Sequence, residues 1–306
     1  MTNKENLMRV LLRNNPEWLP CWKDSCAFVP PSALQDRPRG GNGLDWFGIE
    51  WIDSIPDPAQ ITMDDVCDWR ELVRFPDLDH VDFERAAERD LFGIDRNDKL
   101  VWMPLGGLFE AVNAFMGIEG SLVALMTETE EYQALINAFL DFRLKEIEKI
   151  IEAYKPDVIC MHEDYGMKTN LLMSPDIWQK VFKEPLRKIN AFISERNTLF
   201  ALHSCGKVDQ LIGEFIDVGI NVWDSVNFCN DLESVYEKYG EKISFTTSLD
   251  MIFLATSNEE ETRAHVRDAI RILGKNRNVA IRDDGPTVPK QTLEWVTDEV
   301  RKNREY

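Results

Sequence analysis

The chain has 306 residues, a hydrophobic content of 44% and a formal net charge of −19. This length is typical of one α/β barrel, and apolar residues throughout the chain predict a single folded domain over residues 1–306. The negative charge argues against nucleic acid and anionic membranes as partners. We expect no signal peptide and no membrane span, and six dispersed cysteines without a CxxC pair favour a reducing cytoplasmic location.

The N-terminal third contains few regular elements. Thr2 and Glu5 have the spacing of a capping box, which predicts a helix at the start of the chain. Residues 18–22 (WLPCW) are expected to form a short strand. Residues 30–60 are rich in proline and glycine and predict a loop-rich insertion over one mouth of the domain. Its aromatic stretch LDWFGIEW predicts a hairpin arm.

From residue 99 onward, apolar strand patterns alternate with amphipathic helix patterns. Strands are expected at 99–103, 157–161, 198–203, 220–224, 242–247 and 278–282. Helices are expected at 109–126 with a break near Gly117 and Gly120, at 127–154, 175–196, 208–218 and 232–239, from a cap at Ser257 or Asn258 to Gly274, and at 291–304.

This alternation predicts βαβ units and a parallel sheet. Seven strands can be counted, and we predict a closed (β/α)₈ barrel with one strand missed. A doubly wound open sheet is the alternative, although no GxGxxG motif follows the early strand.

In a barrel, functional side chains gather at the carboxyl ends of the strands. His203 and Cys205 stand two residues apart at one such end, so both side chains can turn toward one point. Imidazole and thiolate are preferred zinc ligands, and further ligands would come from other strand ends. The alternative is a hydrogen-bonded histidine beside a small buried thiol. The polar residues at the other strand ends are His162, Glu163, Asp164, Tyr165, Asp224, Asp283 and Asp284.

Two further groups are candidates for catalysis and substrate binding. Asp164 and Tyr165 pair a carboxylate with a phenol that can polarise a bound group, or else anchor a loop. Gly106 permits close approach of a ligand to the backbone, or simply forms a turn. Trp46 and Trp51 can pack on a flat ligand or in the core.

The chain resembles the uroporphyrinogen decarboxylase superfamily over nearly its full length. The similar stretches are residues 45–51, 162–189, 201–226, 248–251 and 283–289. The most specific parts are His-Ser-Cys-Gly at 203–206 and Asp-Tyr-Gly at 164–166, followed by Ser174-Pro175. The resemblance implies a (β/α)₈ barrel with its cleft at the carboxyl-terminal rim.

The superfamily includes cofactor-free decarboxylation of uroporphyrinogen and methyl transfer between a corrinoid protein and a thiol or methylated substrate. The decarboxylases carry Arg-Gln-Ala-Gly-Arg after the first strand, where this chain has WKDSCAF at 22–28 without paired arginines. Arg37 and Arg39 are poor substitutes for that pair.

The methyltransferase branch binds zinc through a His-x-Cys pair and a later cysteine. The pair is present here, but Arg282-Asp283-Asp284 occupies the position of the later cysteine. The resemblance therefore implies a ligand set of His203, Cys205, Asp283 or Asp284, and Glu163, or else a metal-free site.

The sequence thus predicts a corrinoid-dependent methyltransferase that moves a methyl group between a small molecule and a cobalamin-carrying protein, with zinc or a rim acid activating the heteroatom. A decarboxylase acting on another carboxylate and a non-catalytic barrel that binds a corrinoid or tetrapyrrole are the alternatives. The oligomeric state, including a homodimer, stays open. We expect Asp164 and Tyr165 to be catalytic and His162, Trp46, Trp51, Asp224 and Gly106 to bind substrate.

Overall fold

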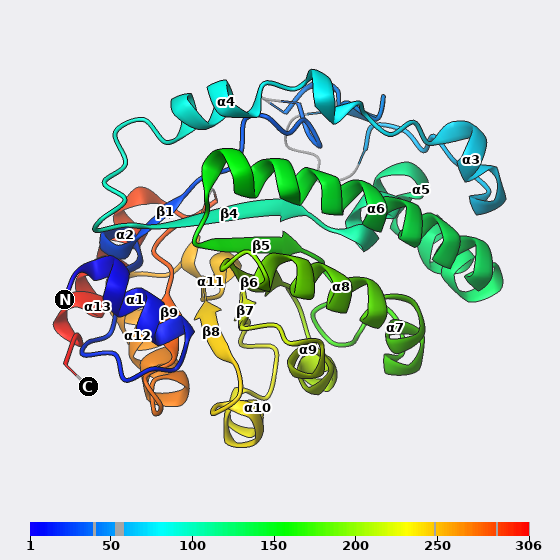
Figure 1. The fold of residues 1–306 in the computed structure, drawn as a ribbon. Helices are drawn as coiled ribbons and strands as arrows, with labels where there is room; N and C mark the ends of the chain where they lie inside the picture. Colours follow the sequence, from blue (N-terminus) through cyan, green and yellow to red (C-terminus); the bar gives the residue numbers. More distant parts are fainter. Residues whose placement is uncertain (39–40, 53–57, 248, 286, 306) are drawn as a thin grey trace.

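The computed structural model describes residues 1–38, 41–52, 58–247, 249–285 and 287–305. Arg39, Ser248, Pro286 and residues 53–57 of the predicted insertion lie outside these residues. The described chain forms a seven-stranded parallel sheet in the order β1-β4-β5-β6-β7-β8-β9 (Figure 1). The strands are β1 (Cys26–Phe28), β4 (Leu100–Gly106), β5 (Val158–His162), β6 (Leu199–His203), β7 (Val222–Asp224), β8 (Ser244–Thr247) and β9 (Val279–Ile281).

Most of the helices lie around the sheet and cover its outer face (Figure 1). They are α1 (Asn3–Leu11), α2 (Trp22–Ser25), α3 (Trp69–Leu72), α4 (Phe83–Asp90), α5 (Leu108–Thr127), α6 (Thr129–Tyr154), α7 (Pro175–Val181), α8 (Lys183–Ser194), α9 (Ile212–Val218), α10 (Leu232–Tyr239), α11 (Met251–Leu254), α12 (Glu259–Leu273) and α13 (Lys290–Lys302). Short 3₁₀ turns are η1 (Val66–Asp68), η2 (Leu78–His80) and η3 (Asp209–Leu211).

The predicted strand at residues 18–22 is wrong. Trp22 begins α2 and packs edge-on against Trp102, with ring centroids 5.1 Å apart. Pro20 has no N–H group for a strand ladder. Only Cys21 forms a parallel bridge, to Ile281 at the end of β9. The described sheet therefore has seven strands and is consistent with a TIM-like barrel, whereas the predicted closed eight-stranded barrel is not formed by these residues.

Most helices follow the predicted pattern. The capping box at Thr2 and Glu5 is present on α1, and α6 covers most of the predicted long helix. Gly117 has φ 66° and ψ 161°, which breaks α5 where the sequence predicted a break. The helix predicted at 175–196 is instead two helices, α7 and α8, which meet at Phe182.

Apolar side chains on one face of the sheet pack against α1, whose last residues lie at the start of β8. Alternate strand residues such as Trp102, Cys160 and Val222 form a cluster with Leu7 and Leu11 of α1. This packing leaves the carboxyl ends of the strands as the end where polar groups can gather.

The predicted insertion contains a hairpin formed by β2 (Gly43–Leu44) and β3 (Glu50–Trp51). We call residues 30–51 the arm, of which residues 39 and 40 are not described. The Asp45 carboxylate accepts hydrogen bonds from the backbone N–H of Phe47 and Ile49 and from Nε1 of Trp51. The Phe47 ring packs among Phe75, Phe115, Phe139 and Phe142, which fixes the arm on α5 and α6.

Helix α5 has the length and hydropathy of a membrane-spanning helix, with 44% of its apolar window buried inside the structure. It packs along α6 and buries Phe109, Val112 and Phe115 on one face. This burial is expected of a helix that packs in a protein core. Ile118, Val123 and Met126 remain exposed on its other face.

Candidate active site

Two histidines meet where β5 and β6 end. His162 and His203 are partners in the parallel register of these strands, and their rings stack 4.2 Å apart at an interplanar angle of 3°. His203 is also the register partner of Asp224 on β7. Three adjacent strands therefore deliver polar side chains to one point of the sheet.

Three potential metal ligands lie together at this point. Nε2 of His203 is 3.2 Å from Sγ of Cys205 and 3.8 Å from Oδ1 of Asp164. The same Asp164 oxygen accepts a hydrogen bond of 2.7 Å from the backbone N–H of Cys205. One ligand atom from each residue lies within 4.8 Å of the other two. The Asp164 side chain is 46% exposed, so the cluster is open on one side.

A charged network supports the His203 ring from behind. Its Nδ1 is 2.7 Å from Oδ2 of the fully buried Asp224, which also accepts hydrogen bonds from Thr246 and from the Arg282 guanidinium at 2.9 and 3.1 Å. Burial disfavours the charged form of Asp224, but Arg282 and His203 outweigh it and hold the pKa of the carboxyl well below its ordinary value.

The same contacts determine the protonation of His203. Burial lowers the pKa of the ring, but Asp224 and Cys205 outweigh burial and raise it well above its ordinary value. With Nδ1 directed at Asp224, Nε2 is the atom that faces Cys205 and Asp164. A metal ion bound at Nε2 would replace the proton there, as metal binding generally does.

Close packing of two loops places Cys205. Gly206 has φ 78°, and a Cβ there would collide with the backbone of Gly166 in the loop after β5. The backbone N–H of Gly206 donates to Oδ1 of Asn227 at 2.8 Å. Only glycine suits this positive φ and close contact, so the sequence Cys-Gly fixes the thiol beside Asp164.

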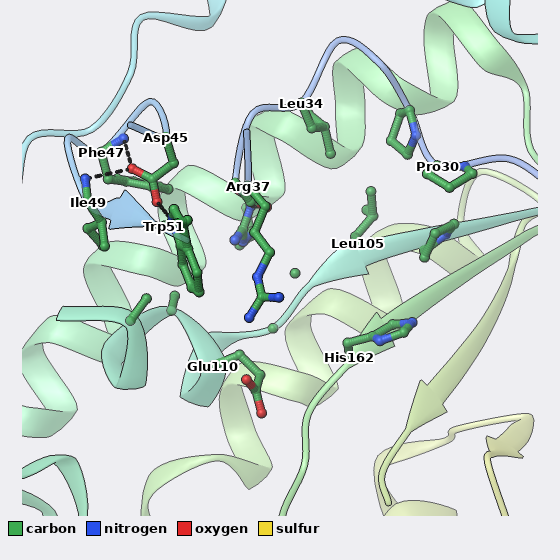
Figure 2. A pocket seen from close by; sticks show the side chains of 18 of the residues that line it. Pro30, Leu34, Arg37, Asp45, Phe47, Ile49, Trp51, Leu105, Glu110 and His162 are labelled. Atoms are coloured by element: carbon green, nitrogen blue, oxygen red, sulfur yellow. Dashed lines mark hydrogen bonds and ion pairs between the residues drawn. The ribbon is translucent and has the colours of Figure 1, made fainter. Parts of the chain in front are cut away.

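A cavity of about 520 Å³ adjoins this cluster at Asp164 and His162. Its walls come from the arm, from the end of β4 and from the first turns of α5 (Figure 2). Arg37 extends from the arm into this space, where its guanidinium lies 4.2 Å from the centroid of the Trp51 ring (Figure 2). Burial and the nearby Asp164 raise the pKa of Glu110, in the first turn of α5, to about 7.

A buried ion-pair network forms part of the cavity wall. The fully buried Arg143 of α6 lies 2.9 Å from Oδ2 of Asp36 and 2.7 Å from Oε2 of Glu146. Since Asp36 belongs to the arm, this network joins the arm to α6. A Cβ on Gly106 would lie 2.7 Å from Arg143 Nη2, so β4 also approaches this point closely.

The other predicted metal ligands have different partners. Glu163 turns away from the cluster and accepts hydrogen bonds from the backbone N–H groups of Leu108 and Phe109 at 2.5 and 2.9 Å, which caps α5. Asp283 accepts hydrogen bonds from the Lys23 N–H and the Thr297 hydroxyl. Asp284 pairs with Arg282 at 2.8 Å.

Only some of the predicted catalytic and substrate-binding residues lie at the cluster or in the cavity. Tyr165 is fully buried, stacks on Phe109 and faces the aromatic core instead of the cluster. Trp46 donates to Asp36 and is absent from the described lining of the cavity. Asp224 lies behind His203. Trp51, His162 and Gly106 do line the cavity.

Four charged residues of this region were missed as site residues: Asp36, Glu110, Arg143 and Arg282. A usable signal existed for Glu110, because it follows the strand-end pair Gly106-Gly107 by three residues and so falls in the first turn of the next helix. Arg143 carries no such signal, since its position in a long amphipathic helix resembles that of a surface arginine.

Residues 104–292 match the model of the uroporphyrinogen decarboxylase (URO-D) family. The structure of a methyltransferase from Methanosarcina mazei is similar, with a TM-score of 0.75 over 99% of both chains and 15% sequence identity. A proposed vitamin-B12 independent methionine synthase from Listeria monocytogenes has a TM-score of 0.42, covering 67% of this chain and 62% of its own, at 12% identity. No curated protein matches. The second structure is too dissimilar to support an argument, and the first shows a shared fold. The family match, which covers more than half of the chain, shows that this protein belongs to the uroporphyrinogen decarboxylase family.

Proposed function

We propose that the protein is a zinc-dependent methyltransferase that exchanges a methyl group between a small molecule in the cavity and a cobalamin carried by a partner protein. The observation that carries the proposal is the convergence of His203, Cys205 and Asp164 within 4.8 Å. The family match and the fold shared with a methyltransferase support the same class of reaction.

The donor set fits zinc. Nitrogen, thiolate sulfur and carboxylate oxygen are all common zinc ligands, and three protein ligands with one open position are typical of a catalytic site. The carboxylate of Asp224 behind His203 matches the support that metal-bound histidines usually receive. When bound, zinc would act as a Lewis acid on the heteroatom that gains or loses the methyl group.

The protein's own groups would bind and orient the substrate. The arm and α5 enclose the cavity, which adjoins the cluster at Asp164. A substrate held there would present one end to the candidate ligands, while the exposed side of the cluster would admit the cobalamin. Glu110 would contact the polar end of the substrate next to Asp164, whose backbone N–H donates to it at 3.3 Å.

The cavity gives less support to uroporphyrinogen as a substrate. The carboxylates of Asp36, Asp45, Glu110 and Asp164 line it, whereas its described lining contains only the guanidinium groups of Arg37 and Arg143. Arg143 is already paired with Asp36 and Glu146. A molecule with many carboxylates would face repulsion here.

The test is to mix the zinc-loaded protein with cob(I)alamin and methyl donors, and separately with methylcob(III)alamin and thiols, and to follow the corrinoid spectrum. We expect conversion between the two corrinoid spectra with wild-type protein, and none with His203→Ala. His80→Ala, at an exposed histidine, is the matched control and should retain activity. Equal conversion by wild type and His203→Ala would contradict the proposal.

A further inference from the structure

We propose that the cavity beside the cluster binds a small organic molecule with an apolar body and a hydrogen-bond-donating end, a hydroxyl or an amine, and discriminates against carboxylates. This inference rests on the proposed function, because it names the substrate class for that reaction. The contacts that support it lie in the cavity, so it can be tested without catalysis.

The outer part of the cavity is apolar. Leu34, Phe47, Ile49 and Trp51 of the arm face Leu105 of β4 and further apolar side chains of α5. Pockets for small molecules generally combine such walls with a few polar groups that fix orientation, and a volume of about 520 Å³ is within their usual range. The arm therefore supplies the surface on which an apolar body would lie.

The inner end of the cavity is rich in hydrogen-bond acceptors. Glu110 and Asp164 both line this end, and His162 lies next to them at the end of β5. An ionised carboxylate accepts hydrogen bonds and donates none. A ligand whose polar end donates hydrogen bonds would satisfy these acceptors, whereas a carboxylate would lie beside like charge and lose its hydration.

Both guanidinium groups of the described cavity lining already have acidic neighbours. Arg143 is buried between Asp36 and Glu146. Arg37 lies 4.2 Å from the centroid of the Trp51 ring and extends into the cavity toward Glu110, whose negative charge it partly offsets (Figure 2). The Asp45 carboxylate is occupied by its own turn and by Trp51 Nε1. In the described lining, the four carboxylates of Asp36, Asp45, Glu110 and Asp164 therefore outnumber the two guanidinium groups.

The experiment compares three probes with one ring system: 2-naphthylmethylamine, 2-naphthylmethanol and 2-naphthoate. Binding to the full-length protein is followed by fluorescence anisotropy of the naphthalene ring, at one constant pH above the pKa of Glu110. We expect the amine and the alcohol to bind about tenfold more tightly than the carboxylate, a difference of about 1.4 kcal/mol. Equal or tighter binding of naphthoate would overturn the inference, as would the failure of all three probes to bind.

Three variants locate the binding. Ala114→Trp, which fills the cavity, should abolish binding of every probe, and Val123→Trp on the exposed face of α5 is its matched control. Glu110→Gln should reduce the preference for the amine over the carboxylate about tenfold, a ratio that a merely structural role would not change. Unchanged binding in Ala114→Trp, or an unchanged ratio in Glu110→Gln, would overturn the inference.

The same titration with His203→Ala separates this inference from the proposed function. The cavity is formed mainly by the arm, β4 and α5, so we expect this variant to retain the probe preference although it lacks a metal ligand. If the wild-type protein binds the probes with the expected preference but transfers no methyl group, the proposed reaction is wrong and the assignment of the cavity still holds. Loss of the preference in His203→Ala would overturn the assignment of the cavity as an independent binding site.

Discussion

At the scale of single residues, the environment of His203 depends on a chain of charged groups. Arg282 binds the buried Asp224, and Asp224 faces Nδ1 of His203. Metal ligands are commonly oriented in this way, and loss of such support typically weakens metal binding 10- to 100-fold. Arg282 is therefore a positioning residue for the proposed metal centre. It acts on His203 through Asp224 and has no hydrogen bond of its own to a candidate ligand atom in the described residues.

We predict that Arg282→Met lowers zinc affinity by about 10-fold or more, because Asp224 loses its bidentate partner and no longer fixes the ring. Competition with a chromophoric chelator measures the affinity, and ¹⁵N NMR of the histidine ring reports whether Nδ1 keeps its partner. Arg271→Met, on the exposed face of α12, is the control. Unchanged affinity and unchanged ring resonances in Arg282→Met would reject this role.

The residues at the strand ends could be predicted from the sequence, but the direction in which each side chain points could not. His203 and Cys205 were expected to share one point because they stand two residues apart after a strand. Glu163 and Asp164 are neighbours in the chain, yet one caps α5 and the other joins the cluster. That difference depends on the turn after β5, which the identity of the residues does not specify.

At the scale of elements, the junction between β4, β5 and α5 positions both the cluster and the cavity. Glu163 closes the first turn of α5, and a Cβ on Gly107 would collide with the His162 carbonyl and the Glu163 carboxyl group. Burial raises the pKa of Glu163 to about 8, although both backbone hydrogen bonds oppose this rise. Since Glu110 belongs to the same first turn, the cap also fixes the polar end of the cavity.

We predict that Glu163→Leu lowers the free energy of unfolding by about 2 kcal/mol, because two buried N–H groups at the start of α5 lose their acceptor. Glu163→Gln retains an amide oxygen and should cost less. Urea denaturation followed by circular dichroism measures both variants. If leucine proves no more damaging than glutamine, the carboxylate does not serve as a helix cap.

The strand and helix pattern from residue 99 onward was predictable because apolar periodicity is strong there. The N-terminal part was harder. WLPCW has strand-like composition, but Trp22 packs on Trp102 and begins a helix. That outcome is decided by a tertiary contact between residues that are far apart in the sequence, which local composition does not encode.

At the scale of the whole molecule, the two ends of the chain meet where the sheet curves round. Asp24 next to β1 pairs with Arg301 of α13 at 2.8 Å, and the backbone N–H of Leu19 donates to the Arg304 carbonyl at 2.9 Å. Together with the bridge between Cys21 and Ile281, these contacts join the first segment to the last. At a net charge of −19, ion pairs between arginine and a carboxylate offset part of the repulsion among the acidic side chains.

Hydrogen bonds from Arg301 lower the pKa of Asp24 below its ordinary value. A lowered folded-state pKa contributes stability above the unfolded-state pKa of about 4, and this contribution is lost as pH falls through the folded-state value. The pair is partly exposed, so we expect Asp24→Asn to cost under about 1 kcal/mol at pH 7. Thermal melts from pH 7 to pH 3 should show the difference shrinking, and a difference independent of pH would contradict this assignment.

Zinc K-edge X-ray absorption on protein purified without chelators tests whether His203, Cys205 and Asp164 form a metal centre. We predict one sulfur ligand at about 2.3 Å among nitrogen and oxygen ligands. We also predict loss of zinc in Cys205→Ser and no change in Cys67→Ser, which alters an exposed cysteine. A zinc-free wild-type protein, or a ligand shell without sulfur that is identical in Cys205→Ser, would show that these residues do not form a zinc centre.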